Sequence, residues 1–245
     1  MKKFALVLGA SGDIGHAICQ SLAEDGWSIY VHYSNNQNAA QRLCEMLSEN
    51  FPAQEFMLVQ GGDFSIVNGA ELVAAQIFNV QAIVFANGQA HYSLLEDTTV
   101  EDMDALWRVH VQNPMRLTAL LSGKLRKHEV SYVLFIGSIW GGEAGSAGGE
   151  ALYATVKGAQ HAFVKSYAKE AALSRIRVNA IAPGFINTSM NSHLSQEELQ
   201  YILDDIPLGS IGQTRDVAEM VRFYLSGKAD YVTGQIVRLN GGWYI

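Results

Sequence analysis

The chain has 245 residues, of which 49% are hydrophobic and 17% are charged, a composition typical of a globular protein and not of a disordered one. A chain of this length buries roughly 70–75% of its unfolded surface, so it needs no disulfide or metal ion to fold. The formal charge of −7 argues against a nucleic-acid partner. No apolar run reaches the ~20 residues that span a bilayer, so we expect no membrane partner.

Short apolar runs alternate with amphipathic segments along the whole chain. The expected strands are residues 4–8, 28–33, 55–60, 82–86, 132–136, 177–181 and 235–239. The expected helices are residues 14–24, 37–49, 66–78, 100–125, 153–173 and 216–225. Alternation at this spacing favours a parallel sheet whose crossover helices cover both faces. We therefore predict an α/β fold for residues 1–245, a single domain with a doubly wound, seven-stranded parallel sheet.

Three segments fit the alternation less well. Residues 1–10 mimic a short secretion signal, but Asp13 follows at once, so a buried first strand is the favoured interpretation. Residues 141–149 are rich in Gly, Ala and Ser and predict a mobile loop. Residues 185–207 form a long connection with one weak helix at 196–204. Long connections in a compact domain are usually lids or binding loops.

The two cysteines, Cys19 and Cys44, lie in segments with helical apolar spacing. We expect both to be buried thiols in a reducing compartment, which makes the cytoplasm the expected location. The seven histidines are scattered, and no spacing among them predicts a metal site.

A glycine-rich turn connects the first expected strand to the first expected helix. Its sequence is Gly9-Ala10-Ser11-Gly12-Asp13-Ile14-Gly15. Glycines let the backbone turn tightly and approach a pyrophosphate, which binds the free N–H groups at the start of the helix. An ordinary strand-to-helix turn is the alternative. Because this turn opens a doubly wound pattern, we favour nucleotide binding.

The end of the second expected strand bears on the choice of cofactor. A carboxylate there would accept hydrogen bonds from a ribose diol and repel a 2′-phosphate. The sequence has Tyr33-Ser34-Asn35-Asn36 instead, which permits NADP. No lysine or arginine is present to bind the extra phosphate, so we expect a modest preference. The alternative is that these polar residues only form a turn.

Two further strand ends place polar residues at the edge where open α/β sheets bind ligands. Asp63 and Phe64 follow the third expected strand, and Asn87 and Gly88 follow the fourth. We expect these four residues to contact the cofactor.

Three residues form the candidate catalytic group. Tyr153 and Lys157 begin a long expected helix, and their i,i+4 spacing puts them on one face. A neighbouring ammonium group favours the phenolate and lowers the pKa of the tyrosine, which suits proton exchange with a carbonyl/alcohol pair. Ser138 ends the fifth expected strand, where its hydroxyl can bind the same oxygen. A Tyr-x-x-x-Lys pair alone is more often a solvated helix face.

Together these residues resemble the short-chain dehydrogenase/reductase family over essentially the whole chain. The matching pieces are residues 9–15, Asp63, Ser138, Tyr153 with Lys157, Arg177-Val178-Asn179, Pro183-Gly184-Phe185-Ile186-Asn187-Thr188 and Gly241-Gly242-Trp243-Tyr244-Ile245. Within the family, the chain is most similar to the bacterial 3-oxoacyl-[acyl-carrier-protein] reductases. The resemblance implies a Rossmann fold that binds NADP.

The resemblance also implies a role for each matching residue. Tyr153 would donate the proton to the carbonyl oxygen and Ser138 would polarise that oxygen. Lys157 would bind the nicotinamide ribose and lower the pKa of Tyr153. The cofactor carboxamide would be held by Thr188 and by the backbone after Pro183 and Gly184, with Ile186 nearby.

The chain departs from the family pattern at the glycine turn and after the fourth strand. Asp13 replaces the usual middle glycine, and Gly12 stands where NADP-using relatives often have a basic residue. We expect the Asp13 carboxylate to point away from the pyrophosphate as a helix N-cap. Asn87 lies in Phe85-Ala86-Asn87-Gly88, where the family usually has Asn-Asn-Ala-Gly, and it supports the strand if it does not bind cofactor.

A third departure is His110, which occupies the position of the family's catalytic asparagine. We expect the imidazole to hold a water that links Lys157 to solvent, and to be neutral in the active state because a second positive charge near Lys157 is unfavourable. Activity should then fall on the acidic side, as His110 gains a proton near pH 6.5. The alternative is that His110 only packs within its helix.

The leading hypothesis is NADP-dependent reduction of a 3-oxoacyl thioester, on acyl carrier protein or CoA, in fatty acid biosynthesis. Reduction of another ketone, sugar or polyol is the second hypothesis, and a nucleotide-binding regulator that has lost catalysis is the third. The resemblance also implies a homotetramer. Lys124, Arg126, Lys127 and His128 close a helix, where cations complement the helix dipole, and this is the default interpretation. The alternative comes from the carrier-protein reductases, in which basic surface near the active-site mouth docks an acyl carrier protein; Arg175 lies in a matching Ser-Arg context.

Overall fold

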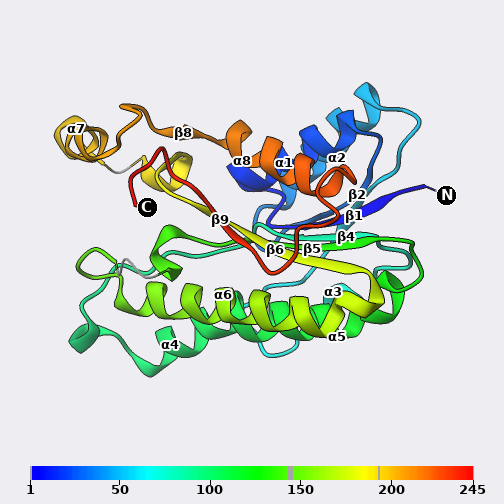
Figure 1. The fold of residues 1–245 in the computed structure, drawn as a ribbon, viewed down its shortest axis with the longest axis horizontal. Coiled ribbons are helices and arrows are strands. Elements are labelled where there is room, and N and C mark those ends of the chain that lie inside the picture. The colour runs from blue at the N-terminus through cyan, green and yellow to red at the C-terminus, as the bar shows by residue number, and fades with distance from the viewer. Residues whose placement is uncertain (1, 143–145, 193, 245) are drawn as a thin grey trace.

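A parallel sheet forms the centre of the molecule in the computed structural model, which describes residues 2–142, 146–192 and 194–244 (Figure 1). The strands are β1 (Phe4–Leu8), β2 (Ser28–His32), β3 (Phe56–Val59), β4 (Ala82–Phe85), β5 (Ser131–Ile136), β6 (Ile176–Pro183) and β9 (Ile236–Leu239). The seven strands have the order β3-β2-β1-β4-β5-β6-β9 and every neighbouring pair is parallel. The predicted doubly wound sheet is confirmed.

Helices cover both faces of the sheet (Figure 1). One face carries α1 (Asp13–Glu24), α2 (Gln37–Asn50) and α8 (Thr214–Leu225). The other carries α3 (Gly69–Ala74), α4 (Val100–Trp107), α5 (Asn113–Leu125) and α6 (Ala151–Ala171). Each face has its own core: Ala5 and Val7 of β1 pack into one, and Leu6 and Leu8 pack into the other. Because both faces are covered, the strands are apolar throughout and lack alternation.

The predicted helix over residues 100–125 is divided in the structure. It consists of α4, a π-helical turn over Arg108–Gln112, and α5. Pro114 accounts for the interruption, because it has no N–H to donate to the carbonyl of His110 four residues earlier. A π-helical turn of this kind often marks a functional site.

Other boundaries also differ from prediction. The helix expected at 66–78 is shortened to α3, because the Gln76 side chain donates to the carbonyl of Leu72 at 2.8 Å and ends the turn. The connection after β6 contains the short strands β7 (Ile186–Asn187) and β8 (Gly212–Gln213), which pair with each other and were not predicted. Between them, α7 (Gln196–Asp205) lies at one end of the molecule (Figure 1).

Some predictions fall partly outside the described residues. Residues 143–145 of the predicted 141–149 loop are among these, as are Met1 and Ile245. Cys19 and Cys44 are both buried and free. None of the helices in the described part of the chain is long and apolar enough to cross a membrane.

Candidate active site

The glycine turn after β1 has the geometry that a pyrophosphate site needs. Gly9 adopts a φ of +72°, and a Cβ there would lie 2.7 Å from the Cα of Asn87. A Cβ on Gly15 would collide with the Gly9 carbonyl oxygen. Only glycine fits either position, and the backbone therefore closes tightly onto the start of α1. These residues fit a dinucleotide.

A cavity of about 450 Å³ opens over this turn, at the carboxyl ends of β1, β2 and β4. The sequence-predicted residues that line it are Gly9, Ser11, Gly12, Asp13, Ile14, Gly15, Ser34, Asn35, Asp63, Phe64, Asn87, Gly88 and Thr188. Lining residues that sequence reasoning missed include His32, Asn36, Gly62, Gln89, Ser189 and Met190. Segments that are far apart in sequence thus form one nucleotide-sized site.

Six residues proposed from sequence as cofactor contacts do not line this cavity, and two of them, Tyr153 and Lys157, belong to the catalytic cluster described below. Tyr33 and Ile186 are buried in the core on the α1 side of the sheet. Pro183 ends β6, and Gly184 donates its N–H to the Leu239 carbonyl at 2.9 Å. Tyr33 was misplaced because a strand sends consecutive side chains to opposite faces, and His32 takes the ligand side.

His32 holds the glycine turn against the loop after β3. Its Nδ1 accepts from the Gly9 N–H at 3.2 Å, and its Nε2 lies 2.9 Å from the Gly62 carbonyl oxygen. An accepting Nδ1 requires the proton on Nε2, so the ring is the neutral tautomer. Burial lowers the pKa of His32 to about 4, in agreement with that tautomer. A histidine at the end of an apolar strand was the available sequence signal.

Asp13 is not the N-cap of α1, contrary to expectation. Gly12 occupies the N-cap position, and Asp13 is the first helical residue. The Asp13 Oδ2 instead accepts from the Ser189 N–H at 2.6 Å, across 176 positions of sequence. The carboxylate therefore ties the glycine turn to the segment after β7 and remains at the mouth of the predicted pyrophosphate site.

The three candidate catalytic residues meet at the carboxyl end of β5. Ser138 follows that strand; its hydroxyl accepts from the Trp140 N–H at 3.2 Å and is close enough to Tyr153 to lower the pKa of that hydroxyl. Lys157 is 3% exposed; its Nζ donates to the Ile136 carbonyl at 2.9 Å and lies 5.6 Å from the centroid of the Tyr153 ring. The helix spacing and the strand end thus bring together the groups expected from sequence.

Burial sets the protonation of this cluster. It raises the pKa of Tyr153 above its ordinary value, although the Ser138 side chain acts in the opposite direction. Burial also lowers the pKa of Lys157 to about 7. The expected lowering of the Tyr153 pKa is therefore not found. The physical reason is that burial removes water from the Tyr153 hydroxyl and so disfavours the charged phenolate.

His110 lies in the π-helical turn, with its ring edge-on to Tyr153 at a centroid distance of 5.7 Å. Its Nε2 is 2.9 Å from the Gln89 carbonyl oxygen, and its buried Nδ1 has no partner in the described part of the chain. Burial, followed by the nearby charge of Lys157, lowers the pKa of His110 to about 3. The ring is neutral, as expected. The acidic limb expected near pH 6.5 is not supported, because burial moves that titration to much lower pH.

Gln160 completes the surroundings of His110, and the sequence analysis missed it. Its Nε2 donates to the His110 carbonyl at 3.1 Å, which is the carbonyl that Pro114 leaves without a helical donor. Asn87 similarly donates to the Val109 carbonyl at 3.2 Å, so it supports the π-helical turn and not the strand. The sequence signal for such a donor was the proline four residues after His110.

Aromatic and acidic side chains that sequence reasoning did not assign border the cluster. Trp140 packs edge-on against Trp243 and Tyr244, with centroid distances of 5.7 and 5.0 Å. Glu150 is buried at the start of α6, where burial raises the pKa of its carboxyl group and the Trp140 side chain acts in the opposite direction. An apolar wall therefore stands next to Ser138.

The basic residues considered for carrier docking lie elsewhere. Lys124 lies in the last turn of α5, Arg126 and Lys127 lie between α5 and β5, and Arg175 precedes β6. They lie at the amino-terminal edge of the sheet, opposite the edge that holds Ser138. The Lys124 ammonium also donates to the Ile77 carbonyl. Within one chain these residues therefore lie apart from Ser138, and docking of a carrier protein stays a prediction.

Comparisons with known proteins agree with this geometry. The chain matches the family of enoyl-(acyl carrier protein) reductases over residues 9–244. The uncharacterized oxidoreductase YmfI of Bacillus subtilis is 40% identical over 245 residues, which cover all of both chains. The 3-oxoacyl-[acyl-carrier-protein] reductase FabG of Escherichia coli is 32% identical over 243 residues, 99% of this chain and 98% of the relative.

Solved structures confirm the fold. The angucycline C-6 ketoreductase LanV with bound NADP superposes with a TM-score of 0.90 at 20% identity, covering 98% of this chain and 95% of that one. A short-chain dehydrogenase from Burkholderia cenocepacia in complex with NADP gives 0.88 at 24% identity, covering 98% and 97%. The chain belongs to the short-chain dehydrogenase/reductase family and is an NAD(P)-dependent oxidoreductase.

Proposed function

We propose that this chain uses NADPH to reduce a 3-oxoacyl thioester to the 3-hydroxyacyl form, as in fatty acid biosynthesis. The observation that carries the proposal is the meeting of Ser138, Tyr153 and Lys157 at the end of β5, with Lys157 buried beside the Tyr153 ring. Similarity over the whole chain to the FabG enzymes, which are named for 3-oxoacyl reduction, supports this substrate class.

The chain's own residues hold the carbonyl and deliver the proton. NADPH supplies a hydride when bound. Ser138 donates a hydrogen bond to the substrate oxygen, and Tyr153 transfers its phenolic proton to that oxygen as negative charge develops there. Lys157, fixed by the Ile136 carbonyl, binds the ribose next to Tyr153 and replenishes its proton.

The polar residues after β2 support a preference for NADPH over NADH. Ser34, Asn35 and Asn36 line the cavity with no carboxylate among them, so nothing there repels a 2′-phosphate. Asn36 also caps α2, because its side chain accepts from the Ala39 N–H at 3.1 Å. The start of that helix therefore lies at the same part of the cavity. No cation adds to this, so we expect NADPH to bind only modestly tighter; NADH binding tenfold tighter would contradict the preference.

The decisive experiment compares substrates. NADPH oxidation is followed with acetoacetyl-CoA, acetoacetyl-carrier protein and a simple ketone at matched concentrations. We expect kcat/KM to be highest for the thioesters. A sugar or simple ketone that exceeds both thioesters would favour the second hypothesis. NADPH binding without turnover of any ketone would favour a regulator, for which the Asp13 carboxylate at the cavity mouth is the specific observation.

The proposal includes a homotetramer and a cytoplasmic location. Exposed apolar side chains on α4 and α5 support assembly: Met103, Trp107 and Met115 are 37%, 45% and 42% exposed. Two buried, free cysteines are consistent with a reducing compartment. Light scattering at several protein concentrations tests the assembly. A carrier protein, if it is the substrate, would dock near the carboxyl edge of the sheet and not on the basic residues after α5.

A further inference from the structure

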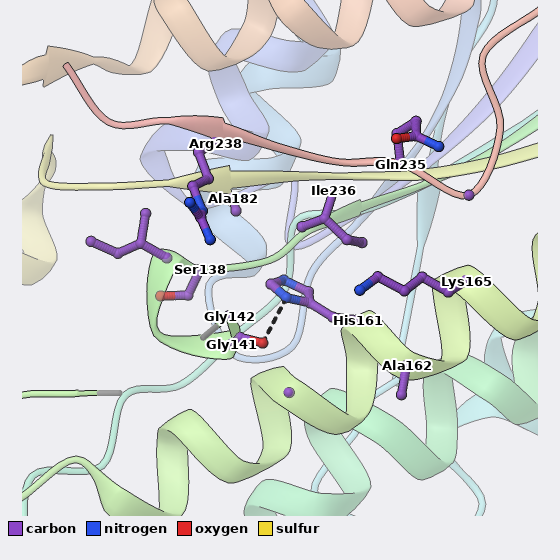
Figure 2. Close-up of a pocket in the computed structure, with 13 residues that line it drawn as sticks. Ser138, Gly141, Gly142, His161, Ala162, Lys165, Ala182, Gln235, Ile236 and Arg238 are labelled. Carbon is purple, nitrogen blue, oxygen red and sulfur yellow. Dashed lines mark hydrogen bonds between the residues drawn. The ribbon is translucent and has the colours of Figure 1, made fainter. Parts of the chain in front are cut away.

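A second cavity, of about 690 Å³, lies on the other side of the turn that follows Ser138 (Figure 2). Its walls are the 3-10 turn Ile139–Gly141, one side of α6, and the strands β6 and β9. Ser138 borders it, but its hydroxyl oxygen points away from His161 (Figure 2). The cavity is larger than the one over the glycine turn and has no role in the mechanism above.

Among the residues that the structure describes, the charged side chains that line this cavity are both positive. They are Lys165 of α6 and Arg238 of β9. Neither cation forms an ion pair within the described part of the chain. Figure 2 shows both side chains directed toward His161. In a chain with a net charge of −7, two unpaired cations in one concave site concentrate a positive potential.

His161 forms the back wall of the cavity, and its pKa responds to the nearby positive charges. It is 5% exposed, and its Nδ1 lies 2.9 Å from the Gly141 carbonyl oxygen. Its Nε2 is buried with no partner among the described residues. Burial lowers the pKa of His161 to about 4, and the charges of Lys157, Lys165 and Arg238 contribute in the same direction.

The backbone around the imidazole is built to admit it. A Cβ on Gly141 would lie 2.7 Å from the His161 Cε1, and a Cβ on Gly137 would collide with its Nε2. The ring therefore fits only because both positions are glycine. Because the His161 Nδ1 donates to the Gly141 carbonyl, the ring offers no donor to an anion, and the groups that favour an anion here are the two cations. Two positive charges do not suit a second copy's apolar surface.

We propose that this cavity is a second ligand site, which binds the phosphate group of a phosphorylated small molecule between Lys165 and Arg238. A phosphate dianion balances the two positive charges, and a guanidinium group binds its oxygens in a bidentate manner. Ile139, Ala182 and Ile236 supply apolar wall for the organic part. The volume lies within the range of roughly 300–1,000 Å³ that is typical of small-molecule sites.

The test is an NMR titration of protein with labelled histidine side chains, using inorganic phosphate and phenyl phosphate at constant ionic strength. Saturating NADP⁺ occupies the glycine turn, and a parallel titration without it keeps the result independent of the proposed function. We expect saturable shifts of the His161 ring resonances. Phenyl phosphate should bind at least tenfold tighter than inorganic phosphate, because it also contacts the apolar wall.

Substitutions locate the site. Lys165→Met and Arg238→Met keep much of the side-chain length and should each weaken phosphate binding at least tenfold. Lys169→Met is the matched control, because Lys169 lies one turn further along α6 and does not line the cavity. Benzoate in place of phenyl phosphate distinguishes a phosphate site from a carboxylate site; equal affinities would overturn the choice of phosphate.

Two results would overturn the proposal as a whole. Shifts that do not saturate, or that persist unchanged in Arg238→Met, would show only general screening. A cavity filled by a second copy would give no His161 shift with phosphate, while Lys165→Met or Arg238→Met would change the oligomeric state in phosphate-free buffer.

Discussion

The catalytic cluster and the glycine turn lie at the same edge of the sheet but in different surroundings. Lys157 and Ser138 are buried, and burial determines the pKa values of the cluster. Around the glycine turn, Asp13 and Ser34 are exposed. Desolvation therefore sets the protonation of the catalytic cluster. At the glycine turn, the main electrostatic feature is the solvent-exposed carboxylate of Asp13, which is held by Ser189. Substitutions should act accordingly, on chemistry and protonation at one site and on cofactor affinity at the other.

The largest effect is expected for Tyr153→Phe. The substitution preserves the ring contact with His110 and removes the hydroxyl that faces the catalytic cluster. We expect kcat to fall about 10²–10⁴-fold while NADPH affinity changes little. Tyr167→Phe is a matched control, because it removes from α6 a buried hydroxyl that has no partner among the described residues. Retained turnover in Tyr153→Phe would assign the proton to another group.

Next in size is a pH dependence of stability that comes from Lys157. Its pKa is about 7 in the folded chain and 10.5 ordinarily, so between these values the unfolded state binds more protons. The free energy of unfolding should therefore rise with pH from about 7 to 10, by at most about 1.4 kcal/mol per pH unit. Below pH 7 this contribution has no slope.

Urea denaturation at several pH values measures this dependence. Lys157→Met should lack the rise, and the exposed Lys165→Met should keep it. If the free energy of unfolding of Lys157→Met rises with pH as steeply as that of the wild-type chain, the rise does not come from Lys157. The buried cluster would then not differ from the glycine turn in the way argued above.

At the glycine turn, Asp13→Asn should strengthen NADPH binding. The amide oxygen still accepts from the Ser189 N–H, but the negative charge near the predicted pyrophosphate is gone. Removing a repulsion of roughly 1–2 kcal/mol gives about a tenfold lower Kd. Fluorescence titration at low salt measures it, with Asp205→Asn on α7 as the control. An unchanged Kd would mean that the carboxylate is directed away from the phosphates.

The smallest effect is expected from removing the Gln160 hydrogen bond to the His110 carbonyl. Gln160→Leu leaves the His110 carbonyl without its donor and should lower the free energy of unfolding by about 1 kcal/mol. Pro114→Ala restores a backbone N–H at the position that can reach this carbonyl. The cost of Gln160→Leu should therefore be smaller in the Pro114→Ala background, as a double-mutant cycle will show. Equal costs in both backgrounds would refute the explanation of the π-helical turn.

Much of the fold and part of the site could be predicted from the sequence because they rest on local rules. Both faces of the sheet are covered, so each strand is a continuous apolar run, and the seven predicted strands are all present. The i,i+4 spacing of Tyr153 and Lys157 placed both residues on one face of α6, and that face meets Ser138 at the end of β5. Glycine at positions 9 and 15 required a close approach that the structure contains.

Only the tertiary structure decided which distant groups meet and how far water is excluded. The Asp13–Ser189 and Gln160–His110 bonds join segments 176 and 50 residues apart, and no periodicity encodes such pairs. Tyr33 directly follows the end of β2 at His32. Because consecutive side chains of a strand face opposite sides of the sheet, a difference of one residue places Tyr33 on the core side and His32 on the ligand side. The pKa values of Tyr153, Lys157 and His110 depend on burial, which is the sum of contacts from several elements. Periodicity reports which face of an element is apolar, whereas desolvation is a property of the assembled core.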